Sequence, residues 1–154
     1  MDYTVQIQQF PGRPLAIVRR RASLQQLSQV IPQACGEVWS AIRAHGVKGA
    51  GRHVAVYLDN EINLEIGVEL DSPVAAMGGV IPSMLPSGTV ATTTHLGPYK
   101  GLGKAHQAVI DWCNSRGHEL VRPCWETYGH WVDEWNKDPS KIRTDVFYLL
   151  KTGH

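Results

Sequence analysis

The feature that most constrains the fold is an order of predicted elements that repeats in the two halves of the chain. Alternating side chains predict strands at 3–10, 15–21, 53–58 and 62–70, and an amphipathic helix lies between the second and the third. The second half predicts strands at 79–84 and 89–96, a helix at about 102–116, and strands at 125–131 and 143–150. An internal repeat indicates a duplicated module. We therefore predict one domain, 1–154, made of two strand-strand-helix-strand-strand pseudo-repeats, 1–75 and 76–154.

Three local features qualify this pattern. Ser23 and Gln26 have the S-x-x-Q spacing of a capping box before the first helix. Pro32 lies inside the apolar stripe and has no backbone N–H, so we predict a short helix before it and the main helix from it onward. In the second half, the tight turn at 59–61 is replaced by a long connection, 132–142, which is a candidate functional loop.

Two helices and about eight strands in this order favour an α+β domain, with an antiparallel sheet that carries both helices on one face. Side chains alternate between the two faces of a strand. Ile66, Val68 and Leu70 in one half, and Val146, Tyr148 and Leu150 in the other, suit the face under the helices. This leaves Glu65, Asp145 and Phe147 for the open face, whereas alternation alone does not decide the face of Glu126.

Composition excludes several classes of protein. With 43% hydrophobic and 19% charged residues the chain is too apolar for disorder, and it has no apolar run that would span a membrane. A net charge of +1 argues against direct nucleic-acid binding. The three cysteines form no C-x-x-C pair and the first residues do not resemble a signal peptide, so we expect a reduced, cytoplasmic protein.

Standard catalytic and cofactor motifs are absent. The segment 97–105 approaches a phosphate-binding loop, but Pro98 and Ala105 stand where that motif needs Gly and Ser or Thr. His118-Glu119 lacks the second His of a zinc motif, and the seven histidines show no ligand spacing. We expect neither a metal nor a cofactor.

An acidic and aromatic group near the end of the chain is the remaining candidate site. It consists of Trp125, Glu126, Tyr128, Trp131 and Trp135. These residues are typical of core and sheet-edge packing. They also suit a cleft in which a carboxylate and aromatic rings attract a cation, or in which the carboxylate acts as a general base or acid. The residues alone leave these alternatives open.

Three segments resemble the GyrI-like family, the effector-binding domains of bacterial multidrug-responsive regulators. They are LPSGTVATTTHLGPY at 85–99, WETY at 125–128 and TDVFY at 144–148. The resemblance implies a duplicated module with a ligand cleft between the halves, on the face away from the helices. It implies that Glu126 lies in this cleft and contacts cationic, aromatic ligands. The expected ligand-binding residues are Glu126, Tyr128, Tyr57, Glu65, Tyr99, Trp131, Trp135 and Phe147.

The resemblance leaves three functions open. Regulators of this family carry a helix-turn-helix domain before the ligand domain, and nothing precedes the first strand here, so we expect a stand-alone member. We favour a protein that binds flat aromatic or cationic small molecules. The main alternative is a hydrolase that opens strained cyclopropanes of DNA-alkylating natural products, with Glu126, and Glu65 beside it, positioning or activating water. A further alternative is a gyrase-inhibitory protein.

Overall fold

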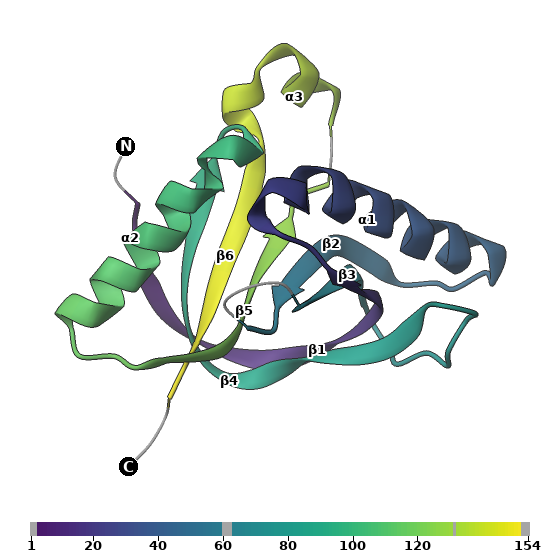
Figure 1. The fold of residues 1–154 in the computed structure, drawn as a ribbon, viewed down its shortest axis with the longest axis horizontal. Coiled ribbons are helices and arrows are strands. Elements are labelled where there is room, and N and C mark those ends of the chain that lie inside the picture. The colour runs from purple at the N-terminus through teal and green to yellow at the C-terminus, as the bar shows by residue number, and fades with distance from the viewer. Residues whose placement is uncertain (1–2, 60–62, 131, 152–154) are drawn as a thin grey trace. The chain divides into compact units, whose positions relative to one another are not determined.

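The computed structural model describes residues 3–59, 63–130 and 132–151 (Figure 1). The chain divides into two compact units, one formed by Pro11–Ser87 and the other by Met1–Phe10 with Gly88–His154. The fold is α+β with antiparallel strand pairing, as predicted. In chain order its elements are β1 (Gln6–Arg21), η1 (Leu24–Gln26), α1 (Leu27–Ala44), β2 (Ala50–Tyr57), β3 (Asn63–Leu70), β4 (Ile81–Leu96), η2 (Tyr99–Gly101), α2 (Leu102–Ser115), β5 (Leu120–Tyr128), α3 (Asp133–Lys137), η3 (Pro139–Lys141) and β6 (Arg143–Leu150).

In the unit 11–87, β3 lies between β1 and β2, and α1 packs against β2 and β3 (Figure 1). Arg20 stands opposite Leu64 in the ladder, and its guanidinium reaches Glu37 on α1. Residues directly opposite each other share a face of the sheet, so Leu64 and the alternate residues that follow it face α1. This confirms the predicted apolar face, which buries Ile66, Val68 and Leu70.

In the other unit, β6 lies between β4 and β5, and α2 packs against β6. The side chain of Tyr148 meets His106 of α2, which places Val146, Tyr148 and Leu150 on the helix side, as predicted. Asp145 and Phe147 lie on the opposite face. That face is not open at the predicted positions, because Asp145 is 7% exposed, Phe147 9% and, in the first unit, Glu65 6%.

The prediction of about eight strands was wrong, because the predicted strands 3–10 and 15–21 are one continuous strand, and so are those at 79–84 and 89–96. β1 runs through Pro11-Gly12 and β4 runs through Pro86 to Gly88. Gly12 adopts φ +82°, a conformation that other residues rarely take, and its backbone lies close to the Leu85 carbonyl. The chain thus bends at this glycine without ending the strand. β1 and β4 each contribute residues to both compact units, so the division between the units falls at 10/11 and 87/88 along the chain.

Two other local predictions need correction. The capping box forms, with the Ser23 backbone N–H donating to Gln26 Oε1 at 3.0 Å, but α1 continues through Pro32 instead of restarting there. The buried stripe of Ala34, Val38 and Ile42 supplies the packing that offsets the hydrogen bond lost at the proline. The long connection contains α3 and η3. β5 starts at Leu120, where a register shift between Val121 and Cys124 hides the alternation. Residues 60 and 61 of the predicted turn at 59–61 lie outside the described residues.

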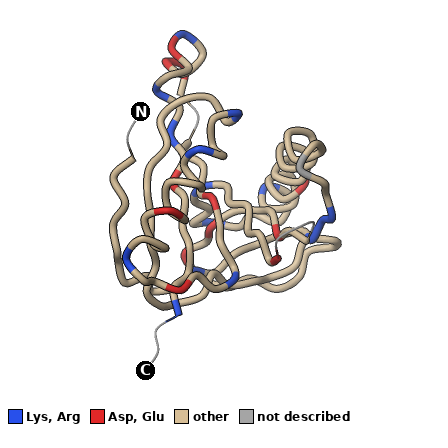
Figure 2. The backbone as a smooth tube through the Cα atoms, turned by 60° about the vertical axis from the view of Figure 1, so that its left-hand side comes forward, with Lys and Arg blue, Asp and Glu red and all other residues tan. Residues whose placement is uncertain are grey.

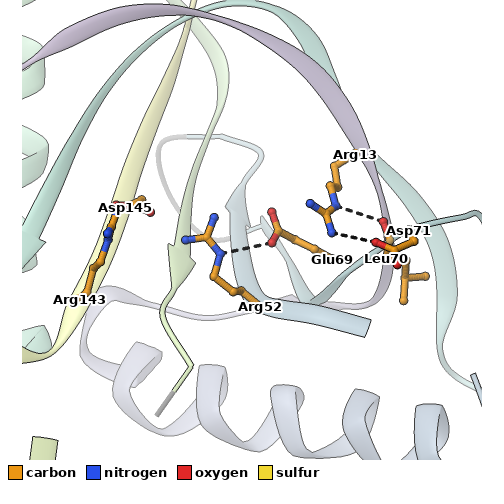
Figure 3. A network of polar contacts seen from close by, with 7 residues as sticks. All are labelled: Arg13, Arg52, Glu69, Leu70, Asp71, Arg143 and Asp145. Atoms are coloured by element: carbon orange, nitrogen blue, oxygen red, sulfur yellow. Dashed lines mark hydrogen bonds and ion pairs between the residues drawn. The ribbon is translucent and has the colours of Figure 1, made fainter. Parts of the chain in front are cut away.

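Buried carboxylates in the unit 11–87 are neutralised by arginines. Glu69 lies 3.5 Å from Nε of Arg52, while Arg13 donates to the Leu70 carbonyl at 3.1 Å and approaches Asp71 (Figure 3). Basic and acidic residues are interspersed along the chain (Figure 2). Among the described residues, no helix combines the length and the apolar character that a membrane-spanning helix needs.

Gly67 tests the packing of β3 on β1. A Cβ at this position would lie 1.8 Å from the Ala16 carbonyl oxygen, which is backbone and cannot rotate away. We expect Gly67→Ala to lower the free energy of unfolding by about 1–3 kcal/mol or more. Gly36→Ala is the matched control, because a Cβ there meets no described atom within 4 Å and the residue is inside α1. This control should raise the free energy of unfolding by about 0.5–1 kcal/mol. Urea denaturation measures both, and equal stabilities of Gly67→Ala and the wild type would contradict the packing.

Candidate functional site

Glu126 is a buried carboxylate on β5 that faces α2. Its residue is 4% exposed, and in the ladder it stands opposite Val146, which lies on the helix side of β6. The Tyr128 hydroxyl donates to Glu126 Oε1 at 2.5 Å, and His106 Nε2 of α2 lies 2.5 Å from Glu126 Oε2. Both carboxylate oxygens therefore have a hydrogen-bond partner, one from the strand and one from the helix.

This geometry corrects the face implied by the family resemblance. The implied cleft lay away from the helices, with Glu126 in it. The contact with His106 instead puts Glu126 on the face that α2 covers. The register of β5 on β6 is the cause, because alternation assigns Glu126 and Tyr128 to the face of Val146 and assigns Trp125 and Thr127 to the other face.

Sequence reasoning missed His106, the residue that joins the helix to Glu126. The seven histidines lack the spacing of metal ligands, and His106 was not among the predicted site residues. The signal was the helical pattern, because His106 lies four residues after Leu102 and three before Val109, and both of these are buried. A histidine on the inward side of a helix needs polar partners in the sheet below. The partners of His106 are the Glu126 carboxylate and the Tyr148 hydroxyl, whose oxygen lies 2.7 Å from His106 Nδ1.

The polar chain continues from Tyr148 to the start of the strand. Tyr148 shares a hydrogen bond with the Cys124 thiol, and Arg122 Nη1 donates to Cys124 Sγ at 3.1 Å. Burial raises the pKa of Tyr148 and the pKa of Cys124 above their ordinary values. Both groups therefore keep their protons at neutral pH. Cys124 is thus a packed thiol and not a thiolate nucleophile.

Aromatic side chains adjoin this cluster. Tyr99 of η2 meets the Tyr128 ring edge-on, with ring centroids 5.7 Å apart. Trp135 of α3 covers Gly129, since a Cβ on that glycine would lie 2.8 Å from Trp135 Cη2. The long connection thus packs on the end of β5. Of the predicted ligand-binding residues, the structure brings Glu126, Tyr128 and Tyr99 into contact and places Trp135 beside the end of their strand.

The other predicted site residues lie elsewhere or are not described. Phe147 is on the opposite face of β6, stacked on Trp125 at 5.4 Å, and borders a hollow of about 520 Å³ that Thr92 and Asp145 also line. Glu65 belongs to the unit 11–87, where it accepts from Ser83 Oγ at 2.6 Å and pairs with Arg19 at 3.3 Å. Tyr57, in the same unit, lies half-buried on β2. Trp131 lies outside the described residues.

Within 3–59, 63–130 and 132–151, no three His, Cys, Asp or Glu side chains are grouped as metal ligands would be. The Glu126 site has one buried carboxylate, one imidazole, and the phenol hydroxyls and rings of Tyr128 and Tyr148.

Comparisons with known proteins agree with this fold. The C-terminal domain of EcmrR is 20% identical with a TM-score of 0.79, over 99% of this chain and 100% of that one. The structure of SAV2435 bound to tetraphenylphosphonium is 18% identical with a TM-score of 0.71, over 98% and 94%. A hydrolase from Listeria innocua is 11% identical with a TM-score of 0.59, over 96% and 92%. At such identities the likeness shows the fold alone.

No curated protein matches the sequence. The family model of the GyrI-like small molecule binding domain, in contrast, matches residues 3–151. Because this match spans nearly the whole chain, the chain belongs to the GyrI-like family of small-molecule-binding domains.

Proposed function

We propose that the domain binds hydrophobic organic cations and that Glu126 supplies the countercharge. The observation that carries the proposal is the burial of the Glu126 carboxylate among Tyr128, His106 and Tyr148. Burying an ionised carboxylate is costly, and hydrogen bonds from neutral groups reduce this cost without cancelling the charge. A ligand cation would remove the remaining cost, because charges interact strongly where water is scarce.

The neighbouring rings suit the same class of ligand. The faces of tyrosine and tryptophan rings attract cations, and the attraction grows when the cation loses its hydration. Tyr128 and Tyr99 are already in contact, and Trp135 lies beside the end of the same strand. A flat or aryl-substituted cation would meet both features of this site, the buried charge and the rings. The comparisons support this choice, because SAV2435, a structural relative, was solved with tetraphenylphosphonium.

We also propose that the two units are copies of one module, a view supported by their strand registers. In one unit, Glu65 of β3 stands opposite Arg19 of β1 and Val56 of β2. In the other unit, Asp145 of β6 stands in the same way opposite Thr94 of β4 and Thr127 of β5. The shared register makes Tyr57 the counterpart of Tyr128. It also makes Ala55 the counterpart of Glu126, so the proposed countercharge belongs to only one copy.

Hydrolysis of strained cyclopropanes is a second candidate, favoured by the hydrogen bond between His106 and Glu126. A carboxylate beside an imidazole can accept a proton from water as the water attacks a ring carbon, while the opened ring takes up a proton on another carbon. A structural relative is described as a hydrolase. Binding and hydrolysis use the same carboxylate, and only hydrolysis requires it to act on water.

Glu126→Gln tests the countercharge. The amide keeps the shape of the side chain and removes its charge, so affinity for tetraphenylphosphonium should fall by about 1–3 kcal/mol, measured by isothermal titration calorimetry at pH 8. Triphenylphosphine oxide, which is neutral, should bind the wild type and the variant alike. Glu119→Gln is the matched control, because Glu119 is an exposed carboxylate of the same unit and pairs with Lys151. Unchanged cation affinity in Glu126→Gln would refute the proposed countercharge.

A turnover assay separates the two candidates. If the domain is a hydrolase, incubation with a spirocyclopropane alkylator should give the ring-opened, water-added product, detected by mass spectrometry. Glu126→Gln should then lower the rate by about 10²–10⁴, the usual contribution of a general base. Product formation at the rate of buffer alone, with intact alkylator bound, would reject hydrolysis of that substrate class and leave binding as the function.

A further inference from the structure

His106 is the partner of Glu126 whose own charge can change near neutral pH. We propose that His106 determines the charge selectivity of the Glu126 site, so that the site accepts a cationic ligand when His106 is neutral and excludes it when His106 is protonated. This inference rests on the proposed function. It concerns a residue that neither the sequence motifs nor the family resemblance pointed to.

The hydrogen bonds define the neutral state of His106. An ionised carboxylate only accepts hydrogen bonds, so Nε2 must carry the hydrogen that is shared with Glu126 Oε2. Nδ1 then accepts from the Tyr148 hydroxyl at 2.7 Å. Burial raises the pKa of Tyr148, so this hydroxyl keeps its proton and remains a donor. In this state the imidazole is neutral and the net charge of the pair is that of the carboxylate.

The same neighbours also satisfy protonated His106. Imidazolium donates from both nitrogens, so Nδ1–H would donate to the Tyr148 oxygen. The Tyr148 hydroxyl can then donate to the Cys124 sulfur, with which it already shares a hydrogen bond. Proton uptake at Nδ1, with rotation of the Tyr148 hydroxyl hydrogen and the Cys124 thiol hydrogen, converts one state into the other. In both states the two ring nitrogens of His106 and the Tyr148 oxygen keep a hydrogen-bond partner, as buried polar groups require.

Protonation of His106 would give Glu126 a positively charged partner that belongs to the protein itself. His106 Nε2 is 2.5 Å from Glu126 Oε2, so imidazolium and carboxylate would form a direct ion pair, and the net charge of the pair would change from −1 to zero. Among the described residues, the titratable groups close to this pair include Tyr148 on β6, and Tyr128, Cys124 and Arg122 on β5. Arg122 stays charged, and burial holds the pKa of Cys124 and of Tyr148 above their ordinary values. Histidine is the side-chain type whose charge ordinarily changes within the physiological pH range, so the proposal assigns the change of charge to His106.

A proton on His106 and a cationic ligand are then competitors for one carboxylate. Binding linkage is reciprocal, so protonation weakens cation binding and a bound cation opposes protonation by the same factor. A purely structural His106, which only holds Glu126 against α2, would predict weaker binding of any ligand after its replacement. It would not predict a difference between cations and neutral ligands, or a dependence on pH.

The test measures the affinity of the full chain for tetraphenylphosphonium between pH 5.5 and 8 by isothermal titration calorimetry. Wild-type affinity should fall by up to about tenfold per pH unit below the titration of His106, the limit for one linked proton. In His106→Gln, whose amide can donate to Glu126 but does not ionise, affinity should change little across this range and should exceed the wild-type value at pH 5.5. His118→Gln is the matched control, since His118 stacks on Trp112 away from the site and its loss should leave the wild-type profile.

A second measurement uses the wild-type chain and does not depend on the folding of a variant. In histidine-detected NMR, saturating tetraphenylphosphonium should move the titration midpoint of His106 to lower pH, because the bound cation disfavours imidazolium. A flat wild-type affinity profile, an equally steep profile in His106→Gln, or an unmoved midpoint would overturn the role of His106 alone. Absence of cation binding at pH 8 would overturn the proposed function and this inference with it.

Discussion

The hydrogen bond between Glu126 of β5 and His106 of α2 is the constraint on which the candidate site depends. It exists because the β5–β6 register puts Glu126 opposite Val146, on the face that α2 covers. One residue of register shift would exchange the two faces and bring Trp125 under the helix. Trp125 is instead fully buried on the other side, stacked on Phe147 and in contact with Phe10. The aromatic packing on one face therefore keeps the carboxylate on the other.

The fold could be predicted from the sequence wherever alternation and helical spacing were uninterrupted. β6 and α2 match their predicted ranges closely, and the apolar residues assigned to the helix side of β3 and β6 were correct. The errors lie at prolines and glycines. Pro11-Gly12 resembles a turn, but Gly12 with φ +82° bends a strand that goes on. Whether such a pair ends a strand depends on the partner across the ladder, which local sequence does not contain.

The candidate site was predicted in part. Glu126 and Tyr128 were named from the acidic and aromatic group near the end of the chain and from the family resemblance. In the structure they share a face because they are two residues apart on one strand. Phe147 was grouped with them, although strand pairing puts it on the opposite face. His106 was missed because its importance comes from a contact between residues 20 positions apart, and a single histidine on a helix has many ordinary explanations. Its position on a buried stripe was the available signal.

The proposed duplication gives a physical reason for one charged and one uncharged copy. At the position of Glu126 the other unit has Ala55, which is fully buried on the face of α1, so that helix and its sheet meet through an apolar contact. A buried carboxylate there would need its own donors, as Glu126 needs His106 and Tyr128. One copy can therefore keep a stable apolar interface, while the other carries the cost of a buried charge. A ligand that neutralises this charge would recover part of that cost, which links the stability of the domain to its binding.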